Sequence, residues 1–335
     1  MLVGRRSVNL HGRKVIETPL LIPSFSSKGF PQVKQLIDVM AQYITESTLV
    51  SAYDIHHGLI KRHYSFCDVI FLDSGGYEAA LDFDLSDARR VDHKPRSWQR
   101  KYYRNTLRSL KLPKTASYVV VNYDNPKSRL RLRGQIQRAR RDFKLLAQGA
   151  FITEFLIKPE SPAGPRKSDK ALYLDIDKIV RDIAHLQDFQ IIGVTEKELG
   201  VSLLGRMSNI GRIRKALHDA NMSQPIHIFG ALDPISVPLY FFAGADIFDG
   251  LTWLRYAYYE GVAVYMANFA ALTLSLDTQE TSAITKTFVN NLSVLASLQR
   301  AMRTFADTED FSVFSHHAGC LETAYKHFKS TRGGH

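Results

Sequence analysis

Short apolar runs alternate with longer amphipathic segments along most of the chain. The runs are rich in β-branched and aromatic residues and are bounded by turn residues, as is typical of buried parallel strands. Seven runs are clear, and residues 49–52 are the candidate for an eighth. The expected strands are residues 18–22, 49–52, 69–72, 118–122, 151–156, 191–194, 226–229 and 247–248.

Helical patterns occupy the segments between these runs. The expected helices are residues 32–40, 96–110, 130–146, 176–186 and 211–220. Regular alternation of strand and helix indicates a parallel α/β architecture. The chain has 335 residues, and a (β/α)8 barrel typically needs about 250. The fold class we predict is therefore α/β, a (β/α)8 TIM barrel.

After residue 267 the pattern changes to one helix after another, with little strand signal, as far as about residue 330. No convincing domain boundary interrupts the chain. We therefore expect a single domain over residues 1–335, whose part from about 267 to 330 is a helical C-terminal region.

Positive charge is in excess and is concentrated in two stretches. The formal net charge is +11, and basic residues cluster between residues 89 and 114, among Trp98, Tyr102 and Tyr103, and again between 127 and 144. A concentrated cationic face attracts nucleic-acid phosphates through counterion release, although a solvated basic surface would have the same composition. We favour nucleic acid. The expected phosphate contacts are Arg96, Arg100, Arg104, Arg131, Arg133 and Arg140.

Cysteine content and apolar run lengths bear on the compartment. Cys67 and Cys320 are the two cysteines, too few for a disulfide framework and in keeping with a reducing cytoplasm. The N-terminal residues lack the apolar core of a signal peptide, and no apolar run approaches the roughly 20 residues that span a bilayer. We expect a cytoplasmic protein that does not contact a membrane.

Three aspartates stand at the ends of predicted strands. Asp73 follows Val-Ile-Phe-Leu and precedes Ser-Gly-Gly-Tyr, Asp124 follows Val-Val-Val-Asn-Tyr, and Asp249 follows Ala-Asp-Ile-Phe. Carboxylates at the carboxyl ends of barrel strands point into the end where such enzymes act. Two of them can divide the work of nucleophile and acid or base. Taken singly, each motif is also ordinary turn chemistry.

Six motifs in a fixed order strengthen the functional interpretation. They are Thr18-Pro-Leu-Leu-Ile-Pro, Phe71-Leu-Asp-Ser-Gly-Gly-Tyr, Asn122-Tyr-Asp, Ile192-Gly-Val-Thr-Glu-Lys-Glu, His227-Ile-Phe-Gly and Gly244-Ala-Asp-Ile-Phe-Asp. With Arg255 shortly after the last of them, they resemble the tRNA-guanine transglycosylase superfamily, most closely its DNA-modifying branch. The resemblance covers about residues 18 to 300.

The resemblance implies an enzyme, a glycosyltransferase that exchanges bases within a nucleic acid. Asp249 would attack C1′ of the target nucleotide and form a covalent aspartyl–sugar intermediate, while Asp73 would act as general acid and base. The target nucleotide would be flipped out or single-stranded. The implied base-binding residues are Tyr77, Asp124, Lys158, Gly193, Val194, Phe229 and Gly230. Among these, Tyr77 would stack on the base, and Lys158 stands near the family's base-reading glutamine, which is a departure.

The family's structural zinc site is the largest departure. That site uses a Cys-x-Cys-x-x-Cys cluster and a later histidine in a His-Asn-Leu context, whereas this chain lacks the cluster and has Asn290-Asn291-Leu there. His316, His317 and Cys320 supply three ligands without a fourth, a poor structural zinc site. We expect no zinc and no other cofactor.

A second departure concerns the nucleotides beside the target. Trp253-Leu254 replaces the family's Pro-Thr before the arginine, so we expect Trp253 and Arg255 to contact nucleic acid. The zinc region supports tRNA binding in the tRNA enzymes, and its loss favours the branch that acts on DNA in phages and bacterial modification systems. We therefore expect guanine in DNA to be replaced by a 7-deazaguanine, such as 7-cyano-7-deazaguanine.

Three alternatives stay open. The enzyme could act on tRNA, the chain could be a non-catalytic nucleic-acid-binding subunit derived from such an enzyme, or it could be an unrelated barrel glycosidase that uses two carboxylates. The expected partners are DNA, or alternatively tRNA, and a 7-deazaguanine base. Whether a partner protein opens the duplex is also open.

Overall fold

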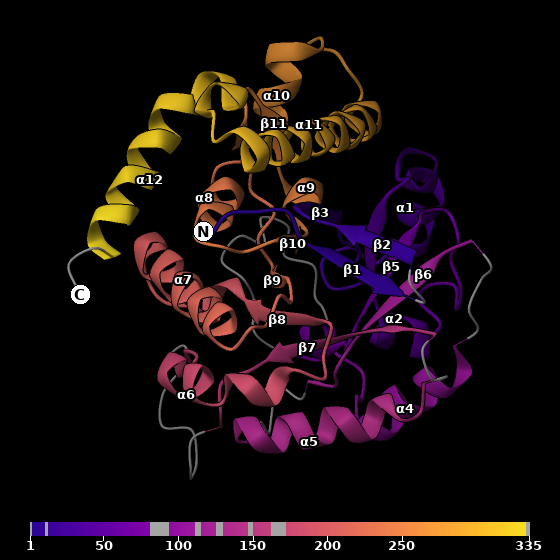
Figure 1. Ribbon diagram of the computed structural model, residues 1–335. Coiled ribbons are helices and arrows are strands. Elements are labelled where there is room, and N and C mark those ends of the chain that lie inside the picture. Colours follow the sequence, from indigo (N-terminus) through magenta and orange to yellow (C-terminus); the bar gives the residue numbers. More distant parts are fainter. Residues whose placement is uncertain are drawn as a thin grey trace.

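Eight parallel strands form a nearly closed barrel at the centre of the molecule (Figure 1). The structure is a computed structural model, which describes residues 2–10, 13–80, 94–110, 115–124, 130–146, 150–161 and 172–332. In chain order the strands are β3 (Leu20–Pro23), β4 (Ser47–Ser51), β5 (Val69–Asp73), β6 (Ser117–Val121), β7 (Ile152–Ile157), β8 (Ile191–Thr195), β9 (Ile226–Phe229) and β10 (Ile247–Gly250). Each predicted strand is confirmed, including the eighth at β4.

The strand order closes the sheet on itself. Neighbours run β3-β10-β9-β8-β7-β6-β5-β4, every pair parallel. The two outer strands then meet through a parallel bridge between Ser24 and Leu49, where the Phe25 amide donates to the Leu49 carbonyl at 2.9 Å. The fold is therefore an α/β, TIM-like barrel, as the alternation of strands and helices predicts.

Side-chain alternation along each strand separates two apolar cores. In β5, Val69 and Phe71 lie in the barrel interior, and Ile70 and Leu72 pack against the surrounding helices. The same two-residue period holds in the other strands, because successive side chains of a strand point to opposite faces. A polar residue two positions from an interior residue of the same strand is thereby directed into the barrel.

Helices cover the outside of the barrel and extend beyond it at the C-terminal end (Figure 1). The α-helices are α1 (Val33–Met40), α2 (Ala52–His56), α3 (Gly76–Ala79), α4 (Arg100–Ser109), α5 (Leu132–Phe143), α6 (Ile176–Arg181), α7 (Leu203–Asp219), α8 (Ser236–Phe242), α9 (Thr252–Arg255), α10 (Met266–Thr273), α11 (Glu280–Thr308) and α12 (Ala318–Arg332). Short 3-10 turns are η1 (Ala41–Tyr43), η2 (Ile183–Leu186), η3 (Glu196–Glu198) and η4 (Phe311–His317). The predicted C-terminal helices are thus present, with α12 in contact with α7 and α8.

Two predicted helices differ in extent. The segment 176–186 is split into α6 and η2, because Asp182 leaves the helical conformation at φ −96° and ψ 11°. The helix expected at 211–220 begins at Leu203, where the Ser202 hydroxyl caps it by accepting from the Gly205 amide at 3.1 Å. No helix in the described ranges is both long and apolar enough to cross a membrane.

Two antiparallel hairpins were not predicted. The first joins β1 (Ser7–Leu10) to β2 (Arg13–Glu17), and it places Val8 and Ile16 against the residues of the barrel interior. The second joins β11 (Ala257–Tyr259) to β12 (Val262–Val264), and it follows β10 and the short helix α9. The first hairpin therefore closes the end of the barrel at which β3 begins.

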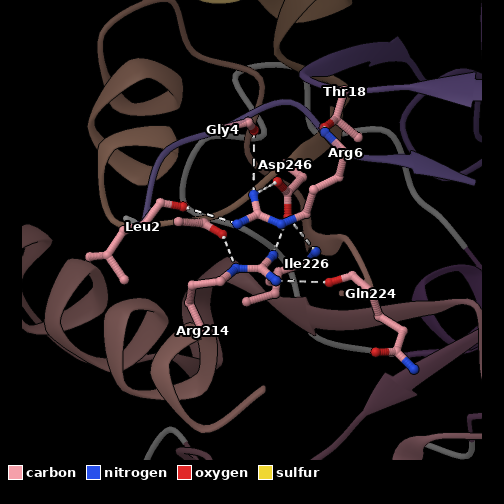
Figure 2. Close-up of polar contacts among 9 residues, drawn as sticks. Leu2, Gly4, Arg6, Thr18, Arg214, Gln224, Ile226 and Asp246 are labelled. Carbon is pink, nitrogen blue, oxygen red and sulfur yellow. Dashed lines mark hydrogen bonds and ion pairs between the residues drawn. The ribbon is translucent and has the colours of Figure 1, made fainter. Parts of the chain in front are cut away.

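A buried ion network ties the N-terminal segment to this end of the barrel (Figure 2). The Asp246 carboxylate, fully buried before β10, accepts from Arg6 at 2.6 Å, from Arg214 of α7 and from the Ile226 amide at 2.7 Å. Both guanidinium groups also donate to backbone carbonyls, those of Leu2, Gly4, Gln224 and Gly244. The network joins the N-terminal segment to α7 and to the residues at the starts of β9 and β10.

Candidate active site

The three predicted aspartates lie at the same end of the barrel. Asp73 is the last residue of β5, Asp124 follows β6, and Asp249 lies near the end of β10. Because all eight strands are parallel, their carboxyl ends meet at one rim. Side chains two positions apart on a strand point to the same face. Asp73 therefore points the same way as Phe71, and Asp249 the same way as Ile247, and both Phe71 and Ile247 belong to the interior core. Gly76 brings Asp124 close to this group, since a Cβ atom on Gly76 would lie 2.8 Å from the Asp124 carboxylate.

Three groups hold the Asp249 carboxylate in place. Oδ2 accepts a hydrogen bond of 2.7 Å from the Ser24 hydroxyl, and Oδ1 accepts one of 3.2 Å from the Gly230 amide. Nε2 of His227 also lies 3.2 Å from Oδ1, a charge contact that lacks hydrogen-bond geometry. The Gly230 backbone has a φ of 83°, a conformation that favours glycine. Asp249 is therefore almost buried and is oriented by residues in or directly after β3 and β9, the strands on either side of β10.

His227 and Glu154 form a buried pair directly behind Asp249. Both side chains are fully buried, and Nδ1 of His227 lies 2.7 Å from Oε1 of Glu154. Burial lowers the pKa of His227, but the adjacent Glu154 and Asp249 carboxylates outweigh burial and raise it to about 9. The sequence interpretation missed both residues, although a histidine and a glutamate in the middle of apolar strand runs were a visible signal.

Asp73 differs from Asp249 in its surroundings. Its Oδ2 accepts from the Gly75 amide at 3.1 Å. Burial, followed by the nearby Glu78 carboxylate, raises the pKa of Asp73 to about 7, and Asp249 adds to the shift. Gly75 has a φ of 86°, and a Cβ atom there would lie 2.6 Å from the Cβ of Tyr53, so only glycine fits the turn. Asp73 can therefore hold a proton near neutral pH.

Two further buried carboxyl groups support Asp73, and neither was predicted. Glu78 accepts hydrogen bonds from the hydroxyls of Ser26 and Ser51. Burial, with Asp54 as the next cause, raises the pKa of Glu78 to about 7. Burial likewise raises the pKa of Asp54 to about 6, against the hydrogen bonds from Ser27. Nearby carboxylates that cannot all ionise together keep protons in this part of the site.

Lys158 is placed among acidic residues. Its ammonium lies 2.8 Å from Glu198 and 3.9 Å from Asp124, and it donates to the Thr195 hydroxyl at 2.8 Å. Asp124 and Glu198 are almost buried as well. The predicted base-binding residues Asp124 and Lys158 are thus brought together, and Glu198 joins them.

Tyr77 lies between two cations. Nη2 of Arg255 donates to the Tyr77 hydroxyl at 2.8 Å, and Nζ of Lys28 lies 4.5 Å from the ring centroid. Lys28 also donates to the carbonyls of Tyr77 and Ala80, each at 3.0 Å. Tyr77 and Arg255 are partly exposed, so both can contact a ligand at this end of the barrel.

The remaining predicted base-binding residues have separate roles in packing. A Cβ atom on Gly193 would lie 2.6 Å from the Phe229 ring and 3.0 Å from Glu154, so Gly193 makes room for both. The Phe229 ring stacks on His227 with 4.0 Å between centroids. Val194 is fully buried in the core between strands and helices. Its side chain therefore points away from the barrel interior, and only its backbone can meet a base.

The prediction that Trp253 contacts nucleic acid is wrong for its side chain. Trp253 is 0% exposed, and its ring packs edge-on against Phe25 and Phe288. Its indole N–H donates to the Ser24 carbonyl at 3.1 Å. Trp253 therefore supports the residue whose hydroxyl holds Asp249.

Most of the predicted phosphate contacts already have carboxylate partners. Arg100 and Arg104 lie against the buried Asp142, at 2.7 and 3.5 Å. Arg133 pairs with Asp182 at 2.8 Å and Arg140 with Asp188 at 2.6 Å. Arg96 and Arg131 are exposed and form no ion pair with a described residue. Several other basic residues of the two clusters fall in 81–93, 111–114 and 125–129, outside the described residues.

Where the resembled family has a zinc-binding histidine, this chain has asparagine side chains that form hydrogen bonds with the backbone. Asn291 is fully buried, donates to the carbonyls of Trp253 and Tyr256 at 2.7 Å, and accepts from the Tyr258 amide at 2.7 Å. Cys320 is exposed, and His317 lies 2.8 Å from the Glu260 carbonyl. Among the described residues, no group of three or more His, Cys, Asp or Glu side chains is arranged to hold a metal ion.

Comparison with known proteins adds no family assignment. No protein-family model matches the chain, and no curated protein matches its sequence.

Proposed function

We propose that the protein is a base-exchange transglycosylase that replaces guanine in DNA by a 7-deazaguanine such as 7-cyano-7-deazaguanine. The observation that supports it most is the contrast between two carboxyl groups at one end of the barrel. Asp249 is fixed by three neighbours, whereas burial and Glu78 raise the pKa of Asp73 to about 7. Base exchange needs one fixed nucleophile and one group that gives and takes a proton at neutral pH.

The first half-reaction breaks the bond between the sugar and guanine. An Asp249 oxygen forms a bond to C1′ as the C1′–N9 bond breaks, and the electron pair of that bond goes to guanine. Protonated Asp73 gives its proton to the departing base. The products are free guanine, an aspartyl–sugar ester and an Asp73 carboxylate.

The second half-reaction reverses these events with the incoming base. The Asp73 carboxylate takes the proton from N9 of the 7-deazaguanine, and N9 forms a bond to C1′. The ester bond to Asp249 breaks, and its electron pair returns to the carboxylate. Asp73 is protonated again, so the protein is ready for another round without any other reactant.

The choice of DNA over tRNA rests on how the sequence departs from the family that it resembles. The sequence lacks the cysteine cluster of the tRNA enzymes. Arg96 and Arg131 are exposed and can meet phosphates. Tyr77 and Arg255 present an aromatic ring and a guanidinium at the end of the barrel where a flipped base would arrive.

The proposal is tested with radiolabelled guanine and three polymers, namely single-stranded DNA, duplex DNA and tRNA. We expect the label to enter DNA with the wild-type protein and not with Asp249→Ala. Label in tRNA alone would overturn the choice of polymer. Binding of all three polymers without exchange would favour the non-catalytic subunit. Release of guanine without incorporation of label would favour a hydrolase.

A further inference from the structure

We infer that His227, paired with Glu154, is a positioning residue that aims the Asp249 carboxylate at the sugar and stabilises it when it leaves the sugar. The inference rests on the proposed function and adds to it the group that controls the nucleophile. Neither His227 nor Glu154 would touch the substrate, and both would act through Asp249.

The geometry places one imidazole between two carboxylates. Nδ1 faces Oε1 of Glu154 at 2.7 Å, and Nε2 faces Oδ1 of Asp249 at 3.2 Å. A neutral imidazole has one N–H, so one of its nitrogens would present a lone pair to a carboxylate. Nε2 makes no hydrogen bond with a described residue, so its contact with Oδ1 is one of charge. Burial raises the pKa of Glu154, and the neighbouring His227 opposes that shift. A doubly protonated ring places a positive charge beside both carboxyl groups, which together favour the imidazolium.

The groups that face His227 come from four strands. The titratable ones are Glu154 of β7 and Asp249 of β10. The ring of Phe229 in β9 stacks on the imidazole, and Phe71 of β5 meets it edge-on with centroids 5.6 Å apart. Because aromatic rings cover the imidazole and its side chain is 0% exposed, its charge acts on Asp249 with little screening.

The charge has a different consequence for each half-reaction. When Asp249 attacks C1′, its negative charge passes into a neutral ester, so the imidazolium does not accelerate this step by charge. When the incoming base displaces the ester, negative charge returns to the Asp249 oxygens beside the imidazolium. A preorganised cation next to a developing negative charge stabilises the transition state. The pair therefore favours release of the modified strand.

The test compares wild-type protein with His227→Gln and Glu154→Gln in the exchange of labelled guanine into single-stranded DNA. Gln at 227 carries no charge, so it removes the ion contact with Asp249. We expect kcat to fall about 100-fold, the size of effect that follows the loss of one electrostatic contact to a reacting oxygen. The KM for guanine should not change, because His227 does not contact the base.

The pH profile separates this role from simple packing. In the wild-type protein, kcat should fall first above about pH 7, where Asp73 loses its proton, and again above about pH 9, where His227 loses its proton. Glu154→Gln should move the second fall to lower pH, and His227→Gln should abolish the second fall alone. Nitrogen NMR of histidine-labelled protein measures the same ionisation without activity. The control is Asp219→Asn, an exposed carboxylate of α7 paired with Lys215, which should leave the His227 titration in place.

The outcomes are distinguishable from failure of the proposed function. A wild-type protein that exchanges no base on any polymer overturns the function and this role with it. Exchange by His227→Gln with the wild-type kcat and pH profile overturns the inference alone. A neutral His227 ring at pH 7 in the NMR spectrum of the wild-type protein also overturns it, even if both variants fail to fold.

Discussion

Replacing Asp246 by Asn should destabilise the barrel strongly. The side chain of Asp246 is 0% exposed and that of its partner Arg214 is 3% exposed. Burial lowers the pKa of Arg214 to about 10, against the opposing effect of Asp246, so the guanidinium is still charged at neutral pH. Removing one partner of a buried ion pair costs about 3–5 kcal/mol, because the other charge stays buried without compensation. Asn keeps one acceptor oxygen but turns the other into an NH2 group that faces a donor, namely Arg6 on one side or Arg214 and the Ile226 amide on the other. We therefore expect a loss of about 4 kcal/mol.

Thermal unfolding followed by circular dichroism or calorimetry measures this effect. For a chain of 335 residues the unfolding entropy is about 0.7 kcal/mol per kelvin, so the midpoint should fall by about 6 °C if unfolding is cooperative. The matched control is Asp219→Asn, since Asp219 forms an exposed pair with Lys215 at 2.6 Å and exposed pairs contribute little. Adding Arg214→Met to Asp246→Asn should recover part of the loss. A midpoint of Asp246→Asn within 1 °C of wild type would refute the reasoning.

Four further outcomes are expected. Asp249→Ala should abolish exchange and trapping of the covalent intermediate, whereas Asp249→Asn should still bind DNA in a gel-shift assay; full activity of either variant would remove Asp249 from the mechanism. Metal analysis of protein purified without added metal should find far less than one zinc per chain, and a stoichiometric zinc would contradict this. Raised carboxyl pKa values of about 7 at Asp73 and Glu78 mean that the folded protein binds more protons than the unfolded chain, so stability should fall as pH rises from about 4 to about 7. Glu78→Gln should therefore raise the melting temperature at pH 8 relative to wild type. If the melting temperatures of the variant and the wild type differ by the same amount at pH 5 and at pH 8, the raised pKa of Glu78 would be contradicted. Replacing Arg96 and Arg131 by Ala should reduce the log–log salt slope of duplex DNA binding by about one unit for each lost contact, and an unchanged slope would assign these arginines to solvation alone.

Strand positions were predictable because buried parallel strands are short apolar runs, and little else in the chain has that pattern. The hairpin β1–β2 was not predictable. Its strands alternate apolar with polar residues over only four or five positions, and such a short pattern resembles an irregular N-terminus. Helix boundaries failed where a single residue decides them, as Asp182 does between α6 and η2. Such choices depend on local backbone geometry that hydrophobic periodicity does not record.

The site was predictable where a strand end determines position, and not where a distant residue determines orientation. The inward direction of Asp73 and Asp249 follows from the alternation of side chains along a strand. Trp253 is different: it turns inward because Asn291, far along the chain, binds the backbone carbonyls of Trp253 and Tyr256. His227 and Glu154 lie inside strands, and the sequence interpretation considered strand ends. The arginine clusters are counted correctly from sequence, but folding brings Asp142, Asp182 and Asp188 to four of the arginines.

Buried charge is arranged differently at the two ends of the barrel, and this bears on how a polyanion could be bound. At one end two guanidinium groups share Asp246, while at the other Asp73, Glu78 and Asp249 lie close together. A rim rich in carboxylates repels phosphates, so affinity for nucleic acid has to come from Arg255 at this end and from basic residues farther out, such as Arg96 and Arg131. Burial raises the pKa of Asp73 and Glu78 to about 7 and so removes part of this repulsion at neutral pH. The same burial lets Asp73 carry the proton that base exchange requires, so one physical cause would serve both the binding and the chemistry of the proposed reaction.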